Sequence, residues 1–389
     1  MELYPVLVRG AIARYIGVAP DFLVEKDPSS DRTKIYAILP SGFCTDISIL
    51  LRKGDVVISS ESIGIKSLCS FVAPPYGCSW CSLEDAARDV EAFVRPIIER
   101  RNVLLCYSGG KDSTLALLLL NHLLDRFDFK LRLVYVYVPL LDDPNNPRIA
   151  ATLASRLGFD LEVIEAKRRD VKSYMRWRGL PRLGNRWCTQ FKTRPIKRLA
   201  KQLDAVVVVA DRATESPKRC RKLFRAIASS TAAHARIRKL YLIAKATLID
   251  VVKIVSEHGL THPLYLRGVT RVSCALCPFK SIYEYIVAKQ SIEDEGLVLS
   301  VLKREYRKAY SRFVPEDTFL RCLLWRFSPQ RAKAIYKLQS FVSKYFAAET
   351  RSIPFDEVRS SLSRLWRGLG ATPRVNLVSV RDLCSTLGS

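Results

Sequence analysis

The sequence predicts an α/β protein built on a parallel β-sheet, with a small β-rich domain before it and a basic helical region after it. Apolar runs typical of buried strands recur at residues 102–107, 131–138, 161–165 and 205–210. Segments with helical periodicity separate them, and strands that alternate with helices form parallel sheets. Before residue 85, shorter apolar runs are broken by turn-forming residues, which is typical of a β-rich domain.

The 389 residues are enough for three domains. We expect a β-rich domain over residues 1–85, an α/β domain over 86–284 and a helical domain over 285–389. Strands are predicted at 34–39 and 55–58 in the first domain. In the second, an amphipathic helix at 83–101 leads into the strand 102–107, and a further helix is predicted at 147–157.

The net charge of +25 indicates a polyanionic partner. Residues 167–240 hold 22 Lys and Arg against four Asp and Glu, with Tyr174, Trp177 and Trp187 interleaved. Basic surfaces with aromatic side chains suit phosphate backbones and unstacked bases, so RNA is the expected partner. The alternative is a solvated helical surface of a heat-stable protein.

No apolar run approaches the roughly 18 residues that span a bilayer, and the first residues form no secretion signal. A cytoplasmic protein without a membrane partner is expected. Its eleven cysteines include two CxxC pairs, Cys78/Cys81 and Cys274/Cys277. In a cytosolic chain this spacing favours metal or redox chemistry, whereas the four histidines show no metal-ligand spacing.

A glycine-rich turn follows the strand 102–107 and precedes an apolar helix. Its residues are Ser108, Gly109, Gly110, Lys111, Asp112, Ser113 and Thr114. Glycines let a phosphate approach the backbone N–H groups at a helix N-terminus, where the helix adds a partial positive charge of roughly half a unit. Lys111 can reach an outer phosphate, and Asp112 can orient Mg²⁺ or the loop.

Three later stretches extend this pattern. They are Arg186-Trp187-Cys188-Thr189 with Lys192 and Pro195; Asp211-Arg212-Ala213-Thr214-Glu215-Ser216 with Arg219; and His262-Pro263-Leu264-Tyr265 followed by Arg271-Val272-Ser273-Cys274-Ala275-Leu276-Cys277-Pro278. Together with the glycine-rich turn, they resemble the PP-loop ATP-pyrophosphatase superfamily and, within it, the phosphoadenosine phosphosulfate (PAPS) reductase-like family. The resemblance covers residues 100–282. Ala210, Ser273 and His262 stand where the family has glycine, glycine and asparagine.

The resemblance implies an adenine-nucleotide α-hydrolase-like fold and cleavage of ATP between its α- and β-phosphates. The nucleotide would be bound by the glycine-rich turn together with Arg212, Glu215, Ser216 and Arg219. Lys111, Asp112, Arg212 and Cys188 are the expected catalytic residues. Arginine matches the geometry of phosphate, but Arg212 can also simply pair with Glu215 on a helix surface.

The cysteines admit two kinds of metal site. By resemblance to tRNA-thiolating PP-loop enzymes, Cys188, Cys274 and Cys277 would hold a 4Fe-4S cluster with one open iron. Alternatively, Cys78 and Cys81 join Cys274 and Cys277 in a closed zinc site. Thiolates suit both metals. A redox dithiol and plain buried thiols remain as further alternatives, and a structural clamp between domains is the expected role of Cys78 and Cys81.

The expected function is an ATP-dependent enzyme that transfers sulfur to RNA, most simply tRNA, from a sulfur donor. One alternative is a PAPS or adenylylsulfate reductase that uses a thiol reductant and releases sulfite; in it, Cys384 would act as the nucleophile on a mobile tail. Another is a non-catalytic RNA-binding protein that keeps a nucleotide pocket. The Lys53-Gly54-Asp55 turn resembles a PUA-type RNA-binding domain in the N-terminal region.

Overall fold

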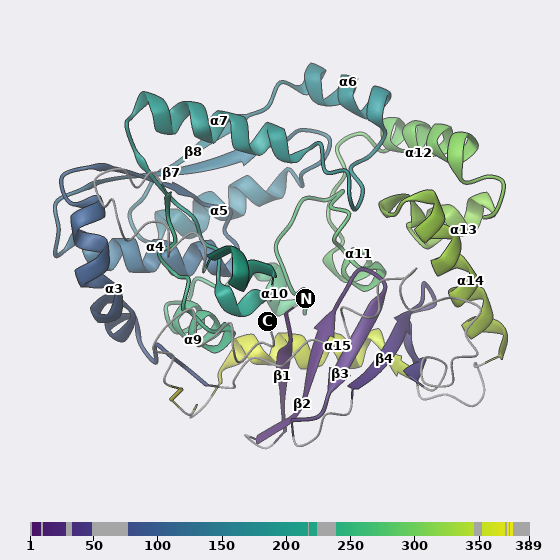
Figure 1. Ribbon diagram of the computed structural model, residues 1–389, viewed down its shortest axis with the longest axis horizontal. Coiled ribbons are helices and arrows are strands. Elements are labelled where there is room, and N and C mark those ends of the chain that lie inside the picture. The colour runs from purple at the N-terminus through teal and green to yellow at the C-terminus, as the bar shows by residue number, and fades with distance from the viewer. Residues whose placement is uncertain are drawn as a thin grey trace.

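The computed structural model describes residues 2–8, 11–28, 33–48, 77–216, 218–223, 239–345, 352–369, 372 and 374–375. Its centre is a parallel sheet with the strand order β10-β9-β6-β7-β8 (Figure 1). The strands are β6 (Asn102–Cys106), β7 (Lys130–Tyr137), β8 (Leu161–Glu165), β9 (Val206–Val208) and β10 (Lys239–Leu240). The predicted parallel α/β core is therefore confirmed.

The chain starts this sheet at β6, adds β7 and β8 on one side, and then returns to place β9 on the other side of β6. Parallel sheets bind ligands at the carboxyl ends of the strands where the order reverses in this way. The glycine-rich turn follows β6, and Asp211 and Arg212 follow β9. The fold thus brings two of the predicted site segments to one crevice.

Helices pack against the parallel sheet and against each other. The chain forms α3 (Leu83–Ile98), α4 (Lys111–Leu124), α5 (Asn145–Ser155), α6 (Arg168–Arg178), α7 (Thr189–Gln202), α9 (Leu248–Glu257) and α10 (Pro263–Leu266) in this region. Every side chain from Leu115 to Leu120 on α4 is buried, because α3 and α9 pack against it. This burial fixes the start of α4, and hence the glycine-rich turn, relative to the sheet.

A second, antiparallel sheet contains the N-terminal strands. Its order is β1 (Tyr4–Val8), β2 (Ala11–Val18), β3 (Phe22–Lys26), β4 (Thr33–Ile38), β5 (Phe43–Asp46) and β11 (Ser352–Pro354). The strand predicted at 34–39 is β4, whereas the predicted strand at 55–58 and the turn at 53–55 lie outside the described residues. Since β11 pairs with β5, a segment of the C-terminal region completes the N-terminal sheet.

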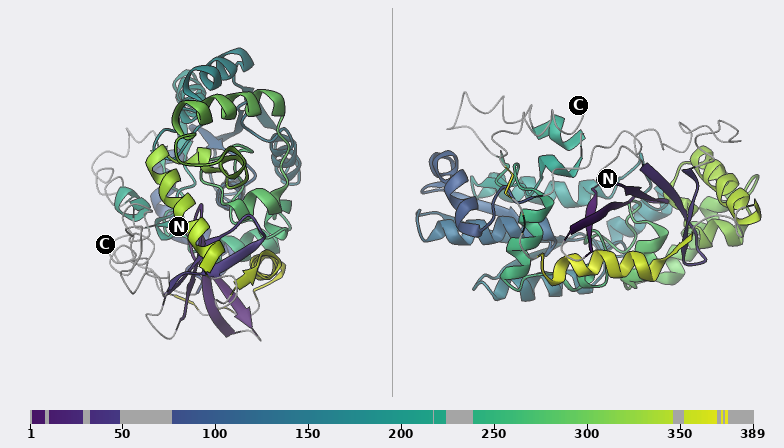
Figure 2. Two further views of the ribbon diagram at one scale, coloured as in Figure 1. Left: turned by 90° about the vertical axis from the view of Figure 1, so that its right-hand side faces the viewer. Right: turned by 90° about the horizontal axis from the view of Figure 1, so that it is seen from below.

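This antiparallel sheet lies between two hydrophobic cores. Tyr36 and Ile38 on β4 belong to the core that includes the parallel sheet, whereas Ile35 and Ala37 belong to a core with the C-terminal helices. Successive residues of a strand point to opposite faces, so both faces of β4 are buried. α15 (Phe355–Arg364) lies along the sheet, as Figure 2 shows in its right-hand view.

The rest of the C-terminal region is helical, as the sequence predicts. It contains α11 (Ile282–Ala288), α12 (Glu295–Ala309), α13 (Glu316–Arg321) and α14 (Pro329–Tyr345), with 3-10 turns at Leu324–Arg326 and Leu365–Arg367. Arg326 is fully buried and donates to Asp21 of the N-terminal region at 2.7 Å. This ion pair ties the helical region to the antiparallel sheet.

Candidate active site

The glycine-rich turn takes a backbone path that requires glycine. Gly109 has a φ of +67°, in the region that side chains disfavour, and a β-carbon there would lie 3.2 Å from the Cα of Ala150. A β-carbon on Gly110 would lie 3.2 Å from the Oγ of Ser108. The turn is therefore packed closely against α5 and against itself, with α4 beginning directly after it at Lys111.

The hydroxyls predicted to meet phosphate hold the turn in shape. Ser113 Oγ accepts from the Ser108 backbone N–H at 3.3 Å and donates to the Gly110 carbonyl at 2.9 Å. Thr114 Oγ1 lies 3.3 Å from the Tyr107 hydroxyl. The first N–H groups of α4 point out of the helix toward this turn, as at every helix N-terminus. A preformed turn of this kind is suited to an anion.

Glu2, Lys111, Asp112 and Arg212 form a largely buried network of two acids and two bases, in which Asp112 is 22% exposed. The Lys111 ammonium lies 3.2 Å from the Glu2 carboxylate and 3.0 Å from that of Asp112. Arg212, which is fully buried, donates through Nε to Asp112 at 2.6 Å and through Nη2 to Glu2. Each base thus meets both acids, which compensates charges that would be costly to bury alone.

The pKa values in this network follow from the pairing. Burial alone raises the pKa of Glu2 and of Asp112, but the charges of Arg212 and Lys111 outweigh it, so both values are lowered. Burial acts against the charged form of Lys111 and Arg212, yet the two carboxylates raise the pKa of each base well above its usual value. All four groups are therefore charged at neutral pH.

Lys111 and Arg212, predicted to contact phosphates, are thus held by protein carboxylates in this structure. Asp112 accepts from both bases, a role that differs from the two expected for it, which were to orient Mg²⁺ or the loop. Glu2 is a member of the site that the sequence analysis missed, because its partner Arg212 is 210 residues away. The N-terminal sheet positions it, since the Tyr4 hydroxyl on β1 donates to the Thr270 carbonyl at 2.6 Å.

Arg219 lies in a different environment from Arg212. It is 39% exposed and pairs with Asp211 at 2.7 Å and with Glu215 at 2.6 Å. Glu215 therefore pairs with Arg219. Arg212 pairs with Glu2 and Asp112 instead of with Glu215. Ser216 Oγ accepts from the Arg219 backbone N–H at 3.3 Å, at the start of the following turn. Of the two arginines, only Arg219 is open to solvent.

His262 was part of the third sequence stretch, but no role in the site was predicted for it. It is 1% exposed, and its Cδ2 would lie 3.5 Å from a β-carbon on Gly109. Its Nδ1 accepts from the Leu264 backbone N–H at 3.2 Å, so the neutral ring carries its proton on Nε2. Burial lowers the pKa of His262 to about 4, which keeps the ring neutral at pH 7.

The Nε2 atom of His262 is buried and has no hydrogen-bond partner within the described part of the chain. A buried donor without an acceptor costs about 1–3 kcal/mol. Since the ring lies against Gly109, an acceptor atom of a ligand in the glycine-rich turn would satisfy it. Tyr265, on the same short helix α10, is also tied to the turn, because its hydroxyl accepts from the Lys111 backbone N–H at 2.9 Å.

Cys188, Cys274 and Cys277 are brought together at the carboxyl edge of the sheet. Burial raises the pKa of Cys188, and the nearby Cys277 raises it further. Burial likewise raises the pKa of Cys274 to about 12, with contributions from Asp142 and Cys277. Cys277 thus lies near both Cys188 and Cys274. Cys188 directly precedes α7, and the other two cysteines lie in the loop between α10 and α11.

Lys192 connects the cysteines to the sheet. Its ammonium hydrogen-bonds to Cys274 and lies 3.4 Å from the buried Asp142 carboxylate, which follows β7. The β-carbon of Val272 would lie 3.8 Å from a β-carbon on Gly110, and two residues span at most about 7 Å, so the backbone of Cys274 lies within about 12 Å of the glycine-rich turn. The turn and Cys274 are therefore in the same region of the fold.

The donor set of three thiols fits a 4Fe-4S cluster with one open iron. Within the described ranges, however, no group of three or more His, Cys, Asp or Glu side chains is arranged to hold a metal ion. The three cysteines are thus not arranged as ligands of a metal ion in this structure. Asp112 is similarly engaged by Lys111 and Arg212, so it is not placed as a Mg²⁺ ligand here.

Cys78 and Cys81 form a disulfide with each other. Sulfurs joined in this way offer no thiolate to a metal, so the proposed zinc site shared with Cys274 and Cys277 is not formed. The disulfide lies at the entry to α3, and Asp250 Oδ1 accepts from the Trp80 backbone N–H within the same loop at 2.9 Å. This arrangement fits the expected structural role better than metal binding.

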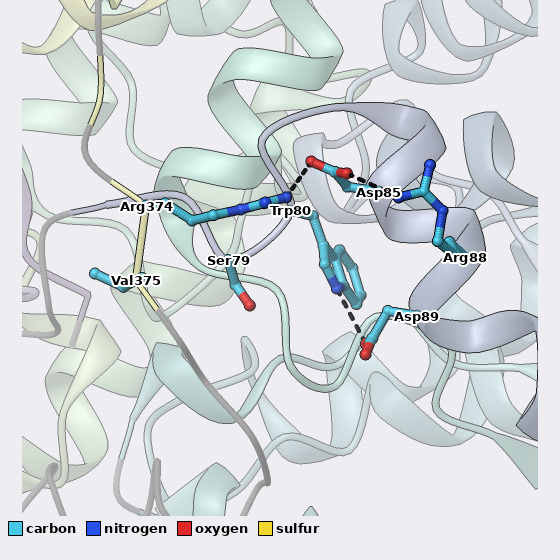
Figure 3. Close-up of a pocket in the computed structure, with 7 residues that line it drawn as sticks. All are labelled: Ser79, Trp80, Asp85, Arg88, Asp89, Arg374 and Val375. Carbon is cyan, nitrogen blue, oxygen red and sulfur yellow. Dashed lines mark hydrogen bonds and ion pairs between the residues drawn. The ribbon is translucent and has the colours of Figure 1, made fainter.

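A cavity of about 580 Å³ opens beside this loop (Figure 3). Its polar side chains are paired with one another: Arg374 contacts Asp85 at 2.6 Å, and Trp80 Nε1 donates to Asp89 at 3.1 Å. The residues that line it include none from the glycine-rich turn or the cysteine trio. Cys384, the candidate nucleophile of the reductase alternative, lies outside the described residues.

Residues 102–280 match the family model described as the phosphoadenosine phosphosulfate reductase domain. This part of the chain is therefore similar to the PAPS reductase-like family, in agreement with the four sequence elements. The match covers the parallel sheet, the glycine-rich turn and all three clustered cysteines. A comparison with curated protein sequences finds no match.

Two solved structures are similar to this chain, both with low TM-scores and low sequence identity. The U34-tRNA thiolase NcsA from Methanococcus maripaludis, solved with its [4Fe-4S] cluster, has a TM-score of 0.36 and 11% identity, over 79% of this chain and 88% of that one. The NH3-dependent NAD synthetase from Campylobacter jejuni has a TM-score of 0.31 and 14% identity, over 67% and 95%. Scores this low do not inform on activity.

Proposed function

We propose that the protein is an ATP-dependent enzyme that transfers sulfur to RNA, most simply a tRNA. The observation that supports this proposal is that the segment carrying Cys274 and Cys277 approaches the glycine-rich turn at Val272, with Cys188 near Cys277. A nucleotide-activating centre next to a set of thiols suits a reaction in which an oxygen atom is first activated and then replaced by sulfur. The PAPS reductase domain match is consistent with this chemistry.

In the proposed reaction, a carbonyl oxygen of a base attacks the α-phosphate of ATP, and pyrophosphate leaves. Sulfide then attacks the carbon, and the oxygen departs with AMP. The turn would bind the phosphates through its N–H groups, and the His262 Nε2–H would donate to one of their oxygens. The three cysteines would hold the sulfur centre; when bound there, a 4Fe-4S cluster would supply an iron that carries sulfide.

The expected RNA partner is supported by a surface that we call the basic ridge, formed by α6, α7 and α12. Figure 1 shows these helices along one edge of the molecule. Their exposed bases are Arg168, Arg169, Arg176 and Arg178 on α6, Arg194, Lys197, Arg198 and Lys201 on α7, and Lys303, Arg304, Arg307 and Lys308 on α12. Their acidic residues are Asp170, Glu295 and Glu305. Such a surface attracts a phosphate backbone.

The ridge also leads to the thiols, because Cys188 is the residue directly before α7. RNA held along α7 would therefore pass the cysteine cluster.

Within the described residues, no helix is long and apolar enough to cross a membrane.

One observation favours a second candidate, a non-catalytic RNA-binding protein that keeps a nucleotide pocket. Glu2 and Asp112 already neutralise Lys111 and Arg212, so neither base is open to a phosphate in this state. This candidate predicts RNA binding without ATP turnover. The sulfonucleotide reductase alternative instead predicts sulfite release from a sulfonucleotide in the presence of a thiol reductant.

The test is to incubate the protein, prepared without oxygen, with ATP, sulfide and an RNA pool, and to analyse the nucleosides by mass spectrometry. The proposal predicts a thionucleoside together with AMP and pyrophosphate, lost in Cys274→Ala. Cys322→Ala removes a buried free thiol outside the site and serves as the control. RNA binding without any product would favour the second candidate, and sulfite from a sulfonucleotide would favour the reductase.

A further inference from the structure

Trp177 is the most exposed large hydrophobic side chain in the described part of the chain, at 71%. The sequence groups it with Tyr174 and Trp187, and the structure keeps the three rings in contact but exposes them to different degrees. Trp187 is 5% exposed and donates through Nε1 to the Gly179 carbonyl, and Tyr174 is half-buried between the two tryptophans. Of the three, only Trp177 presents its ring to solvent.

We infer that Trp177 is a stacking platform for an unpaired nucleobase of an RNA strand bound along the basic ridge. This inference rests on the proposed function, which it deepens by naming the residue that contacts a base. The exposed indole offers a large, flat aromatic surface to a ligand. A flat aromatic face within a cationic surface is the arrangement that binds single-stranded nucleic acid.

The ring is held in position by the helix beneath it. Val171 and Met175 are fully buried one helical turn apart, so Trp177 lies on the opposite face of α6. α12 fixes this end of α6: Arg304 donates to the Met175 carbonyl at 3.1 Å, and a β-carbon on Gly179 would lie 2.5 Å from the Glu305 carboxylate. Trp177 is therefore exposed although the helix that carries it is packed against the rest of the protein.

The charges around the ring favour a nucleic acid over an apolar partner. The Arg178 guanidinium lies 4.5 Å from the centre of the Trp177 ring, which makes a cation–π contact and leaves most of the ring exposed. Arg176 adds a second exposed base beside it. An apolar protein surface would have to remove water from these guanidinium groups, whereas an RNA strand would bring phosphates to them while a base stacks on the indole.

The test compares the affinities of Trp177→Ala and Trp177→Phe for a short single-stranded RNA of mixed sequence and for the corresponding duplex, by fluorescence anisotropy. Loss of one stacked base is expected to weaken single-strand binding by about 5- to 150-fold in Trp177→Ala. Trp177→Phe should keep most of the affinity. Binding to the duplex should change little, because its bases are already stacked on one another.

The matched control is Phe93→Ala, which removes a 39% exposed ring from α3 at the far end of the molecule (Figure 1). Wild-type protein that binds single-stranded RNA with the same affinity as Trp177→Ala would overturn the platform and leave the proposed function standing. Equal losses on single strand and duplex would also overturn it. Wild-type protein that binds neither RNA would contradict the proposed RNA substrate itself. A change in oligomeric mass without a change in RNA affinity would assign Trp177 to a protein contact instead.

Discussion

Replacing His262 with asparagine, the residue usual at this position in the family, should remove a defined part of the acid sensitivity of the protein. Burial lowers the pKa of His262 from 6.5 to about 4, so the unfolded chain takes up a proton in a pH range where the folded protein does not. Stability is therefore complete above about pH 6.5 and is lost as the pH falls toward 4. One pKa unit corresponds to about 1.4 kcal/mol, so the whole loss is about 3 kcal/mol, of which about 2 kcal/mol falls between pH 7.5 and 5.0.

The assay is urea unfolding of wild type and His262→Asn at both pH values. Asparagine can still accept from the Leu264 backbone N–H and still offers a donor toward Gly109, so the packing is largely kept. The difference in unfolding free energy between the two proteins should change by about 2 kcal/mol between the two pH values. His258→Asn, at an exposed position, is the control. An unchanged pH dependence in His262→Asn would refute the assignment of a buried neutral ring.

Three further predictions follow from the same contacts. Glu2→Gln leaves the buried bases with one carboxylate fewer and should lower the unfolding free energy by about 3–5 kcal/mol. The control, Glu99→Gln on the surface, should lower it by less than about 1 kcal/mol. Equal effects of the two substitutions would contradict the network. Reducing the Cys78–Cys81 disulfide should lower stability by about 2 kcal/mol, measured as urea unfolding with and without reductant; no change would mean that the loop does not depend on it. Arg198→Ala, on the basic ridge, should reduce the slope of log affinity for RNA against log salt by about 0.7–0.9, and an unchanged slope would place the phosphates elsewhere.

The parallel sheet was predictable because its central strand β6 is buried on both faces. The run Val103-Leu104-Leu105 is short and precedes a glycine-rich turn, which favours a buried strand, and β6 spans Asn102–Cys106. β11 was not predictable: Ser352–Pro354 is three residues long, contains a proline and has no strand pattern. It becomes a strand only because the edge of β5 is available to it. Tertiary pairing, which local sequence does not encode, decided this element.

The site divides in the same way. The cysteine trio and the glycine-rich turn could be proposed from the sequence because their spacing and residue types indicate their chemistry. Glu2 carried no such signal, since its partners are far away in the chain and ordinary acidic residues are usually exposed. Trp187 and Trp177 have the same residue type in the same basic segment, and only packing separates them. The burial of Val171 and Met175 on one face of a basic helix is the periodic signal that predicts an exposed Trp177.

The most direct test of the account is to identify the products of ATP in the presence and absence of RNA, with sulfide supplied in both. A PP-loop enzyme that activates a base should produce AMP and pyrophosphate in equal amounts, and only when RNA is present. Lys130→Ala, which alters an exposed lysine at the opposite edge of the sheet, should behave as wild type, and Lys111→Ala should lose the reaction. Formation of ADP and phosphate, or the absence of any cleavage by protein that binds RNA, would contradict the proposed activation of RNA by adenylation.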